Sequence, residues 1–159
     1  MGQAHAHNHQ HCIDTAIARA KAICAEAGAK LTAQRQLVLQ LVWQSHKPLG
    51  AYPLMSQLQQ LTGKIVAPPT VYRALEFLLE HGLIHRVHSL NAFVGCDHPG
   101  QPHSSQLLIC RNCGDAQELD SATIDASIAQ LLPANGFRAE GVMLEITGLC
   151  RTCQDNHHG

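Results

Sequence analysis

Two short cysteine pairs, Cys110-Arg-Asn-Cys113 and Cys150-Arg-Thr-Cys153, constrain this chain more than any other feature of its sequence. Two residues between the cysteines of a pair allow both sulfurs to face one point, and two such turns supply the four thiolates that zinc prefers in structural sites. A thioredoxin-like redox function is disfavoured, because neither pair opens a helix after a lone strand. The sequence therefore predicts a zinc ion bound by Cys110, Cys113, Cys150 and Cys153.

The composition of the 159 residues favours two small domains over one large core. The chain holds one Trp, two Tyr and three Phe, so large apolar anchors are few and a bound metal would supplement the core. The sequence lacks an apolar run long enough to span a bilayer and a typical export signal. Together with seven cysteines, an odd number, this predicts a cytoplasmic protein with thiolate ligands rather than disulfides.

Charge is divided along the chain, although the net charge is only −1. Residues 1–95 carry eight Lys and Arg against four Asp and Glu, a balance of +4, whereas residues 96–159 carry three against eight, a balance of −5. A basic half joined to an acidic half suits a nucleic-acid-binding domain attached to a sensing or assembly domain. Ordinary variation of surface charge would explain the same balance, so charge alone does not distinguish a nucleic-acid-binding domain from an ordinary surface.

Apolar periodicity in the first half predicts four helices followed by a two-stranded wing. The strands, at 83–87 and 92–94, flank a short turn. The order of helices and wing is that of a winged helix-turn-helix domain. The four apolar stripes run from Ile13 to Ala27, from Leu37 to Val42 behind a Thr32 cap, from Leu54 to Leu61 after Pro53, and from Val71 to Leu79 after Pro68.

The fourth helix is the candidate DNA reader. Its first turns carry Thr70, Tyr72 and Arg73, which cannot all share the apolar stripe and can bond phosphates or base edges in the major groove. Tyr52 and Arg35 complete the set of candidate DNA contacts. A solvated helix face is the alternative interpretation of Arg73.

The second half predicts a small α/β unit. Strands at 107–110 and 116–119 surround the first cysteine pair, Ser121 can cap a helix, and a strand at 142–147 leads into the second pair. Zinc bound by both pairs would join the beginning of this unit to its end.

Three strings in this sequence resemble the ferric uptake regulator family. The resemblance covers nearly the whole chain, and the metal ligands resemble those of the zinc uptake regulator branch. The strings are Leu31-Thr32-Ala33-Gln34-Arg35, Pro68-Pro69-Thr70-Val71-Tyr72-Arg73-Ala74-Leu75 and the paired Cys-x2-Cys motif.

The resemblance implies an α+β fold, with an N-terminal winged helix-turn-helix domain and a C-terminal α/β dimerisation domain that holds the four-cysteine zinc site. It also implies a homodimeric repressor that binds a near-palindromic DNA operator when loaded with zinc and represses zinc-uptake genes. The expected parts are a His-rich flexible tail (1–12), the DNA-binding domain (13–95), a hinge (96–104) and the dimerisation and metal-binding domain (105–159).

The resemblance further implies a regulatory zinc site at His85, Cys96, His103 and Glu118, which makes two zinc ions per subunit. Sulfur, imidazole and carboxylate together form a donor set that suits zinc, whereas an iron or manganese sensor is expected to use nitrogen and oxygen alone. Nearby alternatives stay open as ligands, and they are His88, Asp97 and His98.

The N-terminus carries further potential ligands, namely His5, His7, His9, His11 and Cys12. We expect a flexible tail there, because no apolar residue before Ile13 would hold it in place, and a weak additional zinc site is left open.

Other functions fit the sequence less well. A zinc-dependent nucleobase deaminase needs His-x-Glu upstream of Pro-Cys-x-x-Cys, and both features are missing, so we expect no enzyme. A metal-buffering protein would explain the histidines but not the reader helix. The closest alternative is an iron- or peroxide-responsive regulator of the same family.

Overall fold

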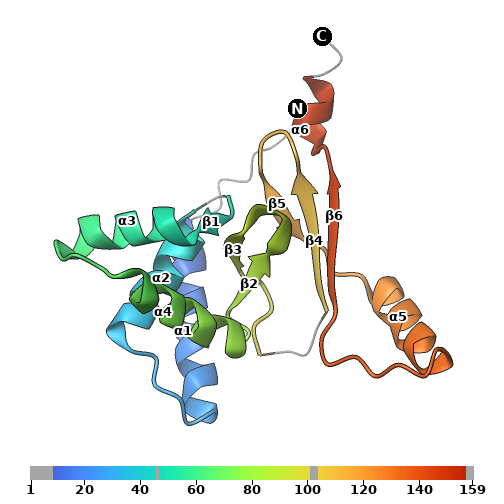
Figure 1. Ribbon diagram of the computed structural model, residues 1–159, viewed down its shortest axis with the longest axis horizontal. Helices are drawn as coiled ribbons and strands as arrows, with labels where there is room; N and C mark the ends of the chain where they lie inside the picture. The colour runs from blue at the N-terminus through green and yellow to red at the C-terminus, as the bar shows by residue number, and fades with distance from the viewer. Residues whose placement is uncertain (1–8, 46, 101–103, 157–159) are drawn as a thin grey trace. The chain divides into compact units, whose positions relative to one another are not determined.

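The computed structural model describes residues 9–45, 47–100 and 104–156, and it separates into two compact units with the boundary after Gly100 (Figure 1). The first unit is mainly helical and carries a small sheet, whereas the second is built on a sheet. This is the α+β organisation that the sequence predicts. Among the described residues, no helix combines the length and the apolar character needed to cross a membrane.

The described part of the first unit forms the expected four helices and the wing. Strand β3 lies between β1 and β2 and runs antiparallel to both. The sequence did not predict β1, because two residues are too few to show an alternating pattern. The elements are α1 (His9–Glu26), α2 (Ala33–Gln44), β1 (Leu49–Gly50), α3 (Ala51–Thr62), α4 (Pro68–Glu80), β2 (Ile84–Val87), the 3-10 turn η1 (His88–Leu90) and β3 (Ala92–Gly95).

Local signals explain where these helices begin. The hydroxyl of Thr32 accepts a backbone hydrogen bond from the first turn of α2 at 3.3 Å, as the predicted cap requires. Helix α3 begins at Ala51 rather than at Pro53, because proline is well tolerated in a first turn, where backbone N–H groups have no partner within the helix. Helix α1 begins at His9 rather than at Ile13, since the residues between them include neither glycine nor proline.

The core of the first unit draws on all four helices and the wing. Leu54 and Leu58 of α3 are buried, whereas Leu61 is 60% exposed. Leu61 lies in the last turn, just before α3 ends at the left-handed cap residue Gly63. The largest side chains buried at below 2% exposure in this unit are Leu39, Leu54, Leu58, Leu75, Leu78, Ile84, Val38, Val71, Val87 and Cys24.

The described part of the second unit is a three-stranded sheet of mixed direction, in the order β5-β4-β6. β4 is antiparallel to β5 and parallel to β6, and helix α5 makes the crossover that parallel strands require. The predicted strands are present, and Ser121 caps α5 by accepting a hydrogen bond from the backbone of Ile124 at 3.4 Å. The elements are β4 (Ser105–Cys110), β5 (Ala116–Glu118), α5 (Ala122–Ala134), β6 (Met143–Gly148) and α6 (Arg151–Asp155).

Helix α5 contributes little apolar packing, since none of its residues is fully buried. A polar network joins its first turns to β4. The amide of Gln106 donates to Asp125 at 2.7 Å and to Ser104 at 2.8 Å, and Ser104 also bonds Asp125. Large apolar side chains of this unit are exposed instead, namely Leu131 (61%), Phe137 (62%), Met143 (44%) and Ile146 (43%).

Candidate metal centres and nucleic-acid interface

The structure brings the four cysteines of the two pairs together in the second unit. Parallel pairing of β4 with β6 sets Cys110 opposite Gly148, so the turn after β4 and the turn after β6 lie side by side. The four sulfur atoms all lie within 4.8 Å of one another, and those of Cys113 and Cys150 are 3.8 Å apart. Four sulfurs gathered at one point fit the tetrahedral donor set of a structural zinc ion.

Hydrogen bonds act unevenly on this cluster, because the pKa of Cys110 is lowered whereas the pKa values of Cys113 and Cys150 are raised. Backbone N–H groups of Cys113 and Cys150 lower the pKa of the Cys110 thiol to about 6, so that Cys110 readily becomes a thiolate. The backbone N–H of Cys150 lies 3.3 Å from that sulfur, and the side-chain amide of Asn112 donates to the sulfur of Cys153 at 3.2 Å. The sequence pattern did not reveal this contact of Asn112, although a polar residue inside a Cys-x2-Cys turn is well placed to bond a ligand sulfur.

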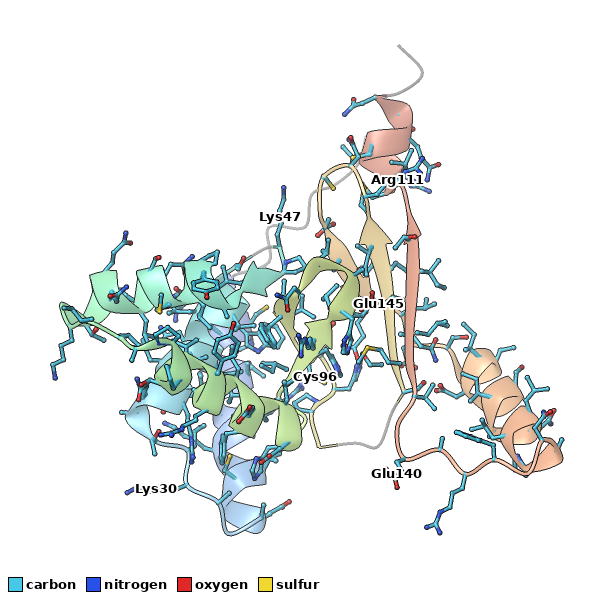
Figure 2. All side chains as sticks on the ribbon, in the orientation of Figure 1. Lys30, Lys47, Cys96, Arg111, Glu140 and Glu145 are labelled. Carbon is cyan, nitrogen blue, oxygen red and sulfur yellow. The ribbon has the colours of Figure 1, made fainter. Side chains whose placement is uncertain are left out.

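The residues expected to sense zinc are distributed over both units. In the first unit, His85 lies on β2 and is half-buried. Cys96 directly follows β3 (Figure 2), and its side chain is only 1% exposed. Pairing of β2 with β3 brings them together, so that their ligand atoms lie within 4.8 Å of each other. In the second unit, Glu118 ends β5 and is half-buried. His103 lies outside the described residues.

The alternative ligands have different surroundings. His88, Asp97 and His98 are less enclosed than Cys96, whose side chain is buried. Of the N-terminal candidates, His11 is exposed on α1 and Cys12 is half-buried there. His5, His7 and the side chain of His9 lie outside the described residues.

Helix α4 presents the predicted reader residues on its outer face. Its buried face is formed by Val71, Ala74, Leu75, Phe77 and Leu78. Tyr72 is 42% exposed and Arg73 is exposed, while Thr70 is half-buried in the first turn. Tyr52, on the first turn of α3, is 66% exposed. Tyr52, Tyr72 and Arg73 are therefore accessible from solvent, and Thr70 is less so.

Arg35 is held differently from the other four candidate DNA contacts. Its guanidinium donates to the backbone oxygen of Lys30 at 2.6 Å and lies 3.8 Å above the centre of the Phe77 ring. A cation over an aromatic ring contributes about 0.5 to 2 kcal/mol, depending on how dry the site is. The contact with Phe77 joins α2 to α4, and the contact with Lys30 fixes the segment before α2, so Arg35 has a structural role in the unit that the sequence did not reveal.

Comparison with known proteins agrees with this arrangement. The model of the ferric uptake regulator family matches residues 26–147. The zinc uptake regulation protein of Escherichia coli K12 is 38% identical over 138 residues, which is 86% of this chain and 80% of that protein. The ferric uptake regulation protein of Campylobacter jejuni is 27% identical over 143 residues, or 89% of this chain and 90% of that protein.

Two solved structures extend the comparison to three dimensions. A zinc uptake regulator complexed with zinc and DNA has a TM-score of 0.86 at 35% identity, covering 92% of this chain and 98% of that one. Holo XcZur has a TM-score of 0.79 at 38% identity, and the match covers 87% of this chain and 96% of that one. The chain therefore belongs to the ferric uptake regulator family, and within it to the zinc uptake regulator branch.

Proposed function

We propose that this protein is a zinc-responsive transcriptional repressor, whose zinc-loaded dimer binds a near-palindromic operator and represses zinc-uptake genes. The observation that carries this proposal is the exposed outer face of α4, with Tyr72 and Arg73, in a chain that resembles a zinc uptake regulator bound to zinc and DNA. Since such a repressor binds chromosomal DNA, we propose that it is cytoplasmic. It is a regulator and not an enzyme.

Two zinc ions per subunit would have different tasks. The first would be held by Cys110, Cys113, Cys150 and Cys153 and would keep the second unit folded. The second would be held by His85, Cys96, His103 and Glu118 and would act as the signal. A buried thiol beside a half-buried imidazole is a suitable beginning for such a site, because zinc accepts sulfur and nitrogen together.

Control of DNA binding would follow from joining the two units through the second site. Two reader helices must match successive major grooves about 34 Å apart, and only a fixed arrangement of the heads does so. Moving an equilibrium from 1:99 to 99:1 needs a preference of about 5.5 kcal/mol, whereas zinc binding to small peptides supplies about 10 to 16 kcal/mol. Ligands that span both units could therefore switch the arrangement even if most of the binding energy organises the site.

The dimer is also supported by the surface of the second unit. Leu131, Phe137, Met143 and Ile146 expose apolar area that one subunit does not cover by itself. A two-fold dimer would bury such a surface and would place two reader helices on a near-palindromic operator.

Operator binding by the purified protein tests the proposal. We expect zinc to promote binding to promoter DNA, with steeply falling affinity as salt rises, and we expect iron and manganese to act weakly. The Cys96→Ser and His103→Ala substitutions should abolish the zinc dependence, while Glu140→Gln, which removes an exposed carboxylate that belongs to no candidate site, should keep it. Binding that responds to iron instead, or that is unchanged in both variants, would overturn the proposal. The thiol of Cys96 makes the iron-responsive alternative less favoured.

A further inference from the structure

The single tryptophan of the chain packs against the backbone immediately before Cys96. Trp43 lies near the end of α2, and its indole covers Gly95, the last residue of β3. A Cβ atom at position 95 would lie only 2.6 Å from the indole Nε1, so only glycine leaves room for the ring. Glycine is therefore required at this position by the tryptophan and not by an unusual backbone angle.

The residues that follow Gly95 are also fixed. The backbone N–H of Cys96 donates to the oxygen of Leu83 at 3.1 Å. The guanidinium of Arg19, from α1, donates to the backbone oxygen of Asp97 at 3.2 Å. Three successive residues are thus held by α2, by the residue before β2, and by α1. Figure 2 labels Cys96 where the chain leaves β3.

We propose that Trp43 and Arg19 are positioning residues that hold Cys96 ready for the regulatory zinc, and that Trp43 is an intrinsic fluorescent reporter of that zinc. The inference rests on the proposed function, since it takes Cys96 as a ligand of the sensing site. Neither side chain offers a suitable ligand atom, so both act through the backbone of residues 95 to 97. The thiol of Cys96 then needs little reorganisation when the ion binds.

The expected loss of zinc affinity follows from what ligand-orienting groups contribute at metal sites. Loss of a group that orients a metal ligand typically weakens metal affinity about 10- to 100-fold. Arg19 makes its hydrogen bond at an exposed position, so its loss should lie at the lower end, about tenfold. If only the charge of Arg19 mattered, Arg19→Gln would instead raise the zinc affinity, because removing a positive charge near the site lowers the repulsion of the ion.

Zinc titration of the full-length protein tests the proposal. The protein is first loaded at the four-cysteine site, and zinc is then added against a competing chelator while tryptophan emission is recorded. We expect emission of the wild type to change as the second zinc binds, and Cys96→Ser to lose that change. We expect Arg19→Gln and Trp43→Phe to lower the affinity for the second zinc about tenfold. Because Trp43→Phe lacks the fluorophore, its affinity is measured by competition with the chelator alone.

Matched variants separate positioning from a general loss of structure. Lys21→Gln removes the same charge from an exposed position of α1 and should keep the wild-type zinc affinity. Gly95→Ala should weaken the second zinc, and adding Trp43→Leu should restore part of the affinity by making room for the methyl group. In Arg19→Gln, zinc binding by the four cysteines and the thermal unfolding of the protein without the second zinc should stay close to wild type.

Several results would overturn the proposal. One such result is wild-type affinity for the second zinc in both Arg19→Gln and Trp43→Phe. Another is a loss of affinity in Lys21→Gln as large as that in Arg19→Gln. A third is tryptophan emission that does not change when the second zinc binds. If Gly95→Ala fails to fold, the decision rests on the other two variants. Should the second zinc bind and depend on both residues while operator binding ignores it, the proposed repressor function fails and this inference stands. Should no second zinc bind at all, both fail.

Discussion

The two units of this chain are stabilised in different ways. Of the twelve largest side chains that are buried at below 2% exposure, ten belong to the first unit, and only Leu107 and Gln106 belong to the second. One of these two is polar, and its side-chain oxygen has no hydrogen-bond partner among the described residues. The first unit is therefore held by an apolar core, whereas the second has few buried apolar side chains and is joined by polar contacts and by the cluster of four cysteines. A small domain with so thin a core needs a metal or an oligomer to stay folded.

The largest expected effect comes from removing the metal of the second unit. Cys113→Ser, or a strong chelator, should unfold that unit, because structural zinc contributes about 10 to 16 kcal/mol in small peptides. The first unit should keep its structure. Hydrogen exchange read by mass spectrometry should show lost protection in β4 and β6 and retained protection in α2 to α4.

The control for this experiment is Cys12→Ser, a cysteine substitution on α1 that should change neither unit. Equal loss of protection in both units would contradict the comparison, because the first unit would then depend on the metal as well.

Core substitution in the first unit should have the next largest effect. Leu54→Ala removes a fully buried side chain and should lower the free energy of unfolding by about 2 to 5 kcal/mol. Leu61→Ala, in the same helix, removes a side chain that is 60% exposed and should change it by less than about 0.5 kcal/mol. Urea unfolding followed by circular dichroism measures both. Similar values for the two variants would show that the apolar core is not what stabilises this unit.

The two units should also differ in their effect on operator affinity, since DNA reading is proposed for the first unit alone. Arg73→Ala should weaken specific binding by about 1 to 3 kcal/mol, the value expected when an arginine that reads a base edge is removed. Arg138→Ala removes an exposed arginine of the second unit and should have little effect. Fluorescence anisotropy with labelled promoter DNA gives both values, and a larger loss in Arg138→Ala would reverse the assignment.

The smallest effect concerns Arg35, which the sequence predicts to contact DNA and which the structure places over Phe77. Arg35→Ala should lower the free energy of unfolding by about 1 kcal/mol and leave operator affinity close to wild type. The outcome that supports the sequence prediction is the opposite one, namely lost operator affinity at unchanged stability. Thermal unfolding and anisotropy on one preparation distinguish the two.

The elements with clear local chemistry could be predicted from the sequence. The Thr32 and Ser121 caps and the proline start of α4 are encoded by neighbouring residues, and the structure has them. The short strand β1 could not be predicted, since its pairing with β3 joins residues far apart in the sequence. The start of α1 was predicted too late, because the N-terminal segment carries no stop signal.

The candidate sites show the same division between local and distant information. Spacing alone indicated that the two cysteine pairs form one cluster, because each pair is a local turn. The position of Arg35 over Phe77 and of Trp43 on Gly95 could not be predicted, since each contact joins two elements through packing that no short pattern encodes. The sensing ligands came from family resemblance, and they remain a prediction.

The parallel register of β4 and β6 has a consequence for folding. Cys110 faces Gly148 across the two strands, so both cysteine turns lie at the same end of the sheet. A slip of one residue would turn every side chain of a strand to the opposite face and move the two turns apart. Zinc could then find only part of its tetrahedron and would bind weakly. Zinc binding by all four cysteines would thus favour the native register of β4 and β6 over a slipped one.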